Sequence, residues 1–160
     1  MFGPGVTTLA GRHLILLEGA PEAALRAVRG LFAATAVELV TMALAEHDRL
    51  MARVLVLAHA LNIAFASTLA GSGESSPQLA AVASTTFARQ LAIARDVVHE
   101  NPALYFEIQH LAPEAAMARR ELAATLASLE RMIQGGDEEG FAALMSAAGR
   151  WFAAGFEAVP

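Results

Sequence analysis

An almost uncharged segment of seventeen residues, from Val54 to Ala70, constrains the fold more than any other feature of this sequence. Its only ionisable side chain is His59, and its length and its leucine and alanine content predict one continuous helix. A polar ring inside such a segment needs a hydrogen-bond partner, because leaving it unpaired costs roughly 1–3 kcal/mol. Either a neighbouring carbonyl satisfies His59 within a core, or the ring belongs to a binding site.

The same segment invites comparison with a membrane-spanning helix, since the stretch from Leu50 to Ala70 has sufficient length. Arg53, His59 and Asn62 interrupt it, and the sequence contains no second segment of this kind. Ionisable groups are costly at the centre of a bilayer, and alanine is first of all a helix former. The sequence therefore favours a buried central helix over a membrane span.

The composition is that of a compact protein with a single core. The chain has 160 residues, a net charge of −5 and no cysteine. The negative charge and the scattered arginines disfavour nucleic acid or an anionic membrane as a partner, and disulfides or cysteine-based zinc sites are excluded. The N-terminus has no charged region followed by an apolar run, so we expect no secretory signal and a cytoplasmic location.

The first forty residues predict one β-α-β unit. The apolar run 13–18 is typical of a strand, Pro21 suits the start of a helix, and residues 37–42 are again strand-like. The intervening helix has an apolar stripe formed by Leu25, Val28, Leu31 and Phe32. Two parallel strands do not form a satisfied sheet alone, so we expect them to pair with each other plus a partner edge, or across a dimer.

From Ala45 onward the sequence predicts helices only. The expected helices cover the residues to about 70, then about 76–100, 102–110, a helix from Pro113 to Gly135-Gly136, and a last helix capped by Asp137. Two of them carry apolar stripes that we expect to be buried: Leu122, Leu126, Leu129 and Ile133 in the first, and Phe141, Leu144, Ala148, Trp151 and Phe152 in the second.

The many alanines predict close helix packing and a thin core. Small side chains allow helices to approach closely, but each buries little apolar area, which is worth roughly 25 cal/mol per Å². Helices with stripes on more than one face gain stability by sharing a core with a second copy. We therefore expect a homodimer.

Several motifs together resemble the C-terminal part of the prephenate dehydrogenase family. The signature begins with His47-Asp48 and continues through Ala52 to His59, as in the first helix of that family's C-terminal domain. The further matching segments are Met1-Phe2-Gly3-Pro4, His13–Gly19, Thr85–Arg89 with Arg95, and Asn101-Pro102-Ala103-Leu104-Tyr105.

The resemblance implies a mainly α fold in which a residual β-α-β piece of a doubly wound nucleotide-binding domain, residues 1–43, precedes an all-helical dimerisation and substrate-side domain, residues 44–160. It also implies the family's reaction in tyrosine and aromatic amino acid biosynthesis. In the full-length oxidoreductase, NAD or NADP would accept a hydride while prephenate loses CO2 and becomes 4-hydroxyphenylpyruvate. The family's helical domains interlock as homodimers, which agrees with the alanine argument.

Two parts of a working dehydrogenase are absent from this sequence. No Gly-x-Gly-x-x-Gly motif follows a strand, and the glycine-rich residues 71–76 follow a helix instead of leading into one. The family's catalytic histidine would lie two residues before Met1. We therefore expect that this chain alone contains no catalytic residue, binds no cofactor and is inactive as a dehydrogenase.

The resemblance assigns four residues to the binding of a prephenate-like dicarboxylate: His59, Arg95, Arg89 and Tyr105. Guanidinium is a natural bidentate partner for a carboxylate, and Arg95 matches the family's carboxylate-binding arginine better than Arg89 does. The two arginines are six residues apart, so they do not share a face of a straight helix.

Other polar residues are expected to have structural roles. Helix capping accounts for His47 and Asp48 without a ligand. The histidines show no spacing that would bind a metal, so no metal site is expected.

Three function classes remain open on the sequence. The chain is the substrate-binding and dimerisation portion of a prephenate or arogenate dehydrogenase, a non-catalytic regulatory module that binds aromatic acids, or a purely structural helical homodimer. The cofactor-reading residues lie outside the sequence, so NAD and NADP are not distinguished.

Overall fold

The structure is a computed structural model, and it describes residues 7–153 and residue 155. Backbone contacts divide the chain into two compact units. One unit is the central part from Asp48 to Phe141, and the other combines the segments before and after it. The units are described separately below. The segment Met1-Phe2-Gly3-Pro4, which carries part of the family resemblance, lies outside the described residues.

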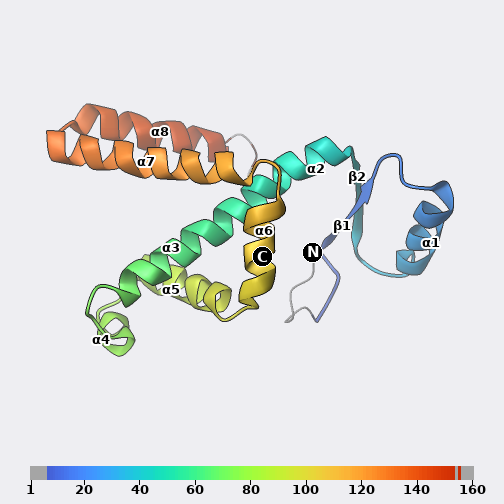
Figure 1. The fold of residues 1–160 in the computed structure, drawn as a ribbon, viewed down its shortest axis with the longest axis horizontal. Helices are drawn as coiled ribbons and strands as arrows, with labels where there is room; N and C mark the ends of the chain where they lie inside the picture. The colour runs from blue at the N-terminus through green and yellow to red at the C-terminus, as the bar shows by residue number, and fades with distance from the viewer. Residues whose placement is uncertain (1–6, 154, 156–160) are drawn as a thin grey trace. The chain divides into compact units, whose positions relative to one another are not determined.

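The N-terminal segment forms the predicted β-α-β unit (Figure 1). Strand β1 (His13–Leu17) pairs in parallel with β2 (Glu38–Met42), with His13 opposite Glu38, and helix α1 (Glu22–Phe32) connects them. The His13 ring and the Glu38 carboxylate lie 3.0 Å apart across this register. The predicted pairing of the two strands with each other is confirmed.

This small sheet buries little of its apolar surface within the described residues. Only Leu16 of the strands is buried, no residue of α1 is buried, and Leu31 in the α1 stripe is 74% exposed. A two-stranded sheet with one helix has too few elements to cover both of its faces. The expectation that the unit needs a further partner remains a prediction.

The apolar segment forms the middle and end of a continuous helix of 27 residues, Leu44–Ala70. It consists of α2 (Leu44–Met51), a π-helical turn η1 (Ala52–Leu57) and α3 (Ala58–Ala70). By length and composition it is a candidate for crossing a membrane, and only 17% of its most apolar window is buried within the chain. The sequence predicted a straight helix here and did not indicate the π-helical turn.

The next helical region, residues 76–98, is divided by a short break whose end is capped by a serine. The single helix expected over residues 76–100 is wrong, because the region forms α4 (Ser76–Ala81) and α5 (Thr85–Val98). The Ser84 hydroxyl accepts a hydrogen bond from the Phe87 N–H and caps α5. Helix α6 (Pro102–Leu111) then follows at the predicted Asn101-Pro102 boundary, and Asn101 is its N-cap.

Helix α7 (Ala115–Gly135) ends at the predicted glycine pair, and α8 (Glu138–Ala153) follows with the Asp137 carboxylate accepting from the Gly140 N–H. Gly136 has φ 65°, a left-handed conformation that glycine adopts easily. The expected burial of the two stripes is only partly correct within a single chain. Large members of both stripes are more than one-third exposed: Leu126, Ile133, Phe141, Trp151 and Phe152.

The core of the central unit lies where η1 meets α7. Ala52, Val56, Ala115 and Ala118 are at most 2% exposed, and no large apolar side chain separates the two backbones. Beside this core the Arg53 guanidinium donates a hydrogen bond to the Glu121 carboxylate. Helix α6 packs against both η1 and α7, while α5 packs along α3 (Figure 1).

Candidate functional site

His59 and Tyr105 form the centre of the candidate site. His59 is the second residue of α3, and Tyr105 lies in the middle of α6. Their rings are stacked, with centroids 4.2 Å apart and planes inclined by 28°. The structure therefore brings together two of the four residues that the family resemblance assigned to a substrate site, from positions 46 residues apart in the sequence.

One nitrogen of the His59 ring, the buried Nδ1, lacks a hydrogen-bond partner among the residues that the structure describes. Burial removes the ring from water and lowers its pKa below the ordinary value of 6.5, which favours the neutral form at pH 7. A neutral imidazole donates one hydrogen bond and accepts another, so His59 suits a hydroxyl or carboxyl ligand better than it suits the role of a permanent cation.

Tyr105 borders an apolar cavity of about 360 Å³ formed by α3, α5 and α6. Burial, and then the nearby Glu100 carboxylate, raise the pKa of its phenol, so the hydroxyl stays protonated at neutral pH. Glu100 also lines this cavity, and its negative charge disfavours a dicarboxylate there. A ligand with two carboxylates therefore needs cations from elsewhere.

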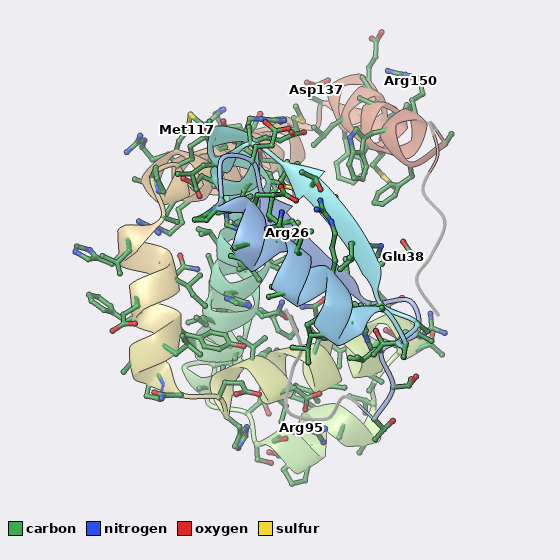
Figure 2. All side chains as sticks on the ribbon, turned by 90° about the vertical axis from the view of Figure 1, so that its right-hand side faces the viewer. Arg26, Glu38, Arg95, Met117, Asp137 and Arg150 are labelled. Atoms are coloured by element: carbon green, nitrogen blue, oxygen red, sulfur yellow. The ribbon has the colours of Figure 1, made fainter. Side chains whose placement is uncertain are left out.

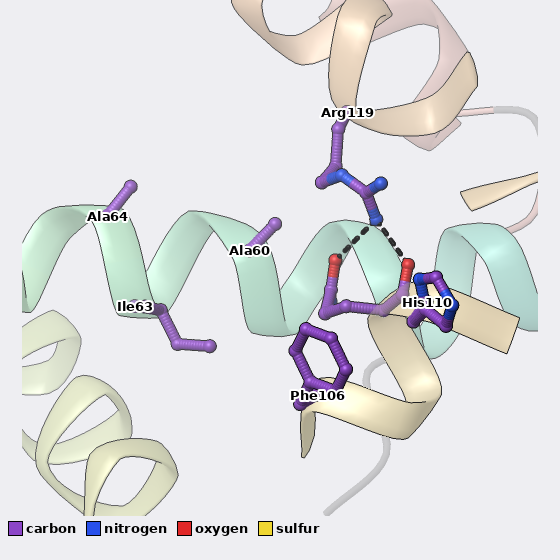
Figure 3. Close-up of a pocket in the computed structure, with 7 residues that line it drawn as sticks. Ala60, Ile63, Ala64, Phe106, His110 and Arg119 are labelled. Atoms are coloured by element: carbon purple, nitrogen blue, oxygen red, sulfur yellow. Dashed lines mark hydrogen bonds between the residues drawn. The ribbon is translucent and has the colours of Figure 1, made fainter. Parts of the chain in front are cut away.

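A polar network connects α6 with α7 (Figure 3). The Arg119 Nη1 donates to both the backbone oxygen and the side-chain Oε1 of Gln109, at 2.6 and 2.9 Å. The Gln109 Nε2 in turn donates to the Val56 carbonyl at 2.9 Å. Gln109 and Arg119 also line a second cavity, of about 410 Å³, whose other walls are the residues Ala60, Ile63, Ala64, Phe106 and His110.

The sequence analysis did not identify Gln109 or Arg119. One signal was present, since Gln109 is four residues after Tyr105 and hence on the same face of α6. Nothing in the sequence indicated that Arg119, ten residues later, would contact Gln109, because the turn between α6 and α7 determines that contact.

The two predicted arginines lie on α5. Neither of them lines the cavity beside Tyr105 or the cavity beside Arg119. Arg95 forms an ion pair with the adjacent Asp96, at 3.0 Å between Nη2 and Oδ1, and the side chains are 68% and 70% exposed (Figure 2). Arg95 also borders a cavity of about 250 Å³ between α3, α4 and α5. Arg89 is exposed. An exposed pair of this kind is weak, so Arg95 can exchange Asp96 for another carboxylate at little cost.

His47 and Asp48 do not cap a helix, contrary to the sequence-based expectation. Helix α2 begins at Leu44, and the His47 N–H already bonds to the Ala43 carbonyl, so both residues lie inside the helix. Among the described residues no group of three His, Asp or Glu side chains is arranged to hold a metal ion.

Comparison with known proteins identifies relatives for most of the chain. Residues 44–147 match the family described as prephenate dehydrogenase, dimerization domain. A 4-amino-4-deoxyprephenate dehydrogenase from Streptomyces pristinaespiralis is 32% identical over 149 residues, which cover 91% of this chain and 49% of that protein.

The crystal structure of an arogenate dehydrogenase from Synechocystis matches 86% of this chain and 50% of its own, with a TM-score of 0.64. At 16% identity this similarity concerns the fold. The chain thus spans about half the length of these relatives. The fold class predicted from the sequence, mainly α with a residual β-α-β piece, is confirmed.

Proposed function

Because this chain belongs to the prephenate dehydrogenase family, we propose that it is the dimerising, substrate-side portion of a dehydrogenase that oxidatively decarboxylates prephenate or a close analogue. The match of residues 44–147 to the family's dimerization domain carries this proposal. The complete enzyme would transfer a hydride to NAD or NADP and would operate in tyrosine biosynthesis. We also propose that the chain functions as a homodimer in the cytoplasm, without nucleic acid or a membrane as a partner.

The chemistry of the substrate fits the residues that the structure brings together. Prephenate carries two carboxylates and a ring hydroxyl, and in the family's reaction removal of the hydroxyl proton assists hydride departure from the same carbon. The neutral His59 would hydrogen-bond to the substrate through its imidazole, and the Tyr105 ring would hold the imidazole in place. Arg95 would supply a cation for a carboxylate, with Arg89 as the second candidate.

The group on the ring carbon distinguishes prephenate from its 4-amino analogue. The relative from Streptomyces is named for the 4-amino analogue, and the structural relative for arogenate. Prephenate and the 4-amino analogue differ at the ring carbon, where a hydroxyl donates and accepts hydrogen bonds while an ammonium group only donates. A His59 nitrogen that accepts a hydrogen bond is compatible with both, so all three compounds belong in the test.

Isothermal titration of the 160-residue chain tests the substrate side directly. We expect prephenate to bind the wild-type chain, and Arg95→Ala to weaken the affinity by about ten-fold to over a hundred-fold, which corresponds to a lost charge-assisted pair of roughly 1.5–3 kcal/mol. Arg131→Ala, which removes an exposed arginine of α7, is the matched control and should bind as the wild type does. Unchanged affinity in Arg95→Ala would remove Arg95 from the site.

The same preparation tests whether the chain is catalytic. Incubation with prephenate and either nicotinamide cofactor should produce no reduced-cofactor absorbance, because the sequence contains no phosphate-binding glycine motif. Steady turnover would contradict the proposal of a non-catalytic portion.

Two alternatives give different results in these experiments. A regulatory module would bind aromatic acids tightly and would never contribute to turnover when joined to a nucleotide-binding domain. A purely structural dimer would bind no dicarboxylate at all. The free and buried His59 Nδ1 favours a ligand-binding role over the purely structural one.

A further inference from the structure

The π-helical turn η1 determines where His59 points. It ends at Leu57, two residues before His59, within an otherwise α-helical segment. Each residue of an α-helix turns the chain by about 100°, so a turn with one extra residue moves every later side chain to a different face. Anything that stabilises this turn therefore also sets the orientation of the His59 ring.

Gln109 hydrogen-bonds to the backbone of this turn. Its Nε2 donates to the carbonyl of Val56, the penultimate residue of η1, and Val56 is only 1% exposed. Where a π-helical turn meets an α-helix, a buried carbonyl is stabilised by a hydrogen-bond donor from a neighbouring element. The donor here comes from α6.

Helix α6 contacts the long helix at two points that are one turn apart. Gln109 bonds to Val56, and Tyr105, four residues earlier on the same face of α6, stacks on His59, three residues after Val56. The two contacts hold the backbone of the π-helical turn and the ring that follows it against one rigid helix.

Arg119 determines the orientation of the Gln109 side-chain amide, that is, the positions of its oxygen and its nitrogen. A guanidinium only donates hydrogen bonds, so the amide oxygen must face Arg119 (Figure 3). The amide nitrogen must then face the Val56 carbonyl. Arg119 also bonds to the Gln109 backbone oxygen in the last turn of α6, where a cation is favourable. Helices α7, α6 and η1 are thus connected through a single amide.

We propose that Gln109 is a positioning residue, oriented by Arg119, that holds the η1 turn and thereby keeps His59 stacked on Tyr105 for its ligand. The inference rests on the proposed function in that it places His59 on the substrate side. Gln109 itself need not touch the substrate.

Two substitutions separate the possible roles of the amide. Gln109→Glu keeps an acceptor for Arg119 but replaces the donor to Val56 with a second oxygen. Gln109→Leu removes both interactions at similar size. Ala127→Glu, at an exposed position of α7, is the control for the added charge.

The measurement combines structure and affinity at pH 7.5 in the 160-residue chain. Nuclear Overhauser contacts between the His59 and Tyr105 ring protons report the stack, circular dichroism reports the helical content, and titration with prephenate reports binding. In Gln109→Glu we expect unchanged helical content, loss of the ring contacts and about tenfold weaker binding. Ala127→Glu should match the wild type.

Retention of the His59–Tyr105 contacts in Gln109→Glu would overturn the positioning role, and would leave Gln109 as a partner of Arg119 only. If Gln109→Leu does not fold, Gln109→Glu still decides the question. If the wild-type chain does not bind prephenate, the proposed function fails, while the ring contacts still test the positioning role independently.

Discussion

At the scale of single residues, the unusual feature is a half-buried histidine in an apolar helix that stacks on a tyrosine and keeps one nitrogen unpaired. Such an atom is costly to leave unsatisfied in a folded protein. Its persistence in this structure distinguishes His59 from a histidine that serves only in packing. The charge state of the ring then determines what it can bind.

The pH dependence of stability should reveal His59. The pKa of His59 in the folded chain lies below its ordinary value of 6.5, which applies to the unfolded chain. Between the folded and the unfolded pKa, the unfolded chain therefore binds a proton that the folded chain does not. The contribution is therefore fully present above pH 6.5 and is lost as the pH falls toward the folded pKa. We expect the free energy of unfolding to decrease less between pH 7.5 and pH 5.5 in His59→Phe than in the wild type. Urea unfolding at fixed protein concentration measures this difference.

His110→Phe is the control for this experiment, because His110 also stacks on an aromatic ring but is exposed. It should retain the wild-type decrease. An equal decrease in His59→Phe and the wild type would show that His59 is not the group responsible.

At the scale of helices, the contact between η1 and α7 depends on small side chains. Ala52, Ala115 and Ala118 are almost completely buried, and Val56 is the largest fully buried side chain of the described residues. The absence of bulk lets the two backbones approach closely, which is what allows α6 to reach both of them. Stability here depends on fit more than on buried area.

Ala118→Leu should therefore destabilise the protein. The position is 0% exposed, and inserting a larger side chain into a packed contact costs about 1–3 kcal/mol. Ala123→Leu, at an exposed position of the same helix, should change the free energy of unfolding by less than about 0.5 kcal/mol. Chemical denaturation measures both, and equal effects would contradict the packing described for α7 and η1.

The end of α7 offers a second test, because alanine substitutions at two neighbouring glycines should change the free energy of unfolding in opposite directions. Gly136 has a left-handed backbone, so Gly136→Ala should cost about 1 kcal/mol. Gly135 is the last residue of the helix and has open space around it, so Gly135→Ala should stabilise by about 0.5–1 kcal/mol. Thermal unfolding of both variants should move the midpoint in opposite directions, and a shift in the same direction would contradict the assigned cap.

At the scale of the whole molecule, the chain leaves much apolar surface uncovered. In the central unit Val54, Phe106, Leu126 and Ile133 are each more than half exposed. Surfaces of this kind mark interaction sites in soluble proteins. The chain matches a family described as a dimerization domain, and we propose that a second copy covers part of this surface.

The mass in solution should be about twice that of one chain, which is 16.7 kDa. Light scattering coupled to size-exclusion chromatography at micromolar concentration measures it. The mass should fall toward that of one chain on dilution below the dissociation constant. A monomer that persists on concentration would contradict the homodimer.

The sequence by itself determined most elements of this protein and indicated the family to which it belongs. The β-α-β start, the long apolar helix, the Asn101 cap of α6, the Gly136 stop and the Asp137 cap are all consequences of nearby residues. Propensities, periodicity and caps act over a few residues, so they can be interpreted without the fold.

Only the tertiary structure decided how the site is assembled. The stack of His59 on Tyr105 and the hydrogen bonds from Arg119 through Gln109 to Val56 join different helices. The π-helical turn is local, but propensity and periodicity did not indicate it. Spacing arguments also did not indicate that Arg95 pairs with its neighbour Asp96. These contacts depend on how closely alanine-lined helices approach one another, and that distance is a property of the packed helices together.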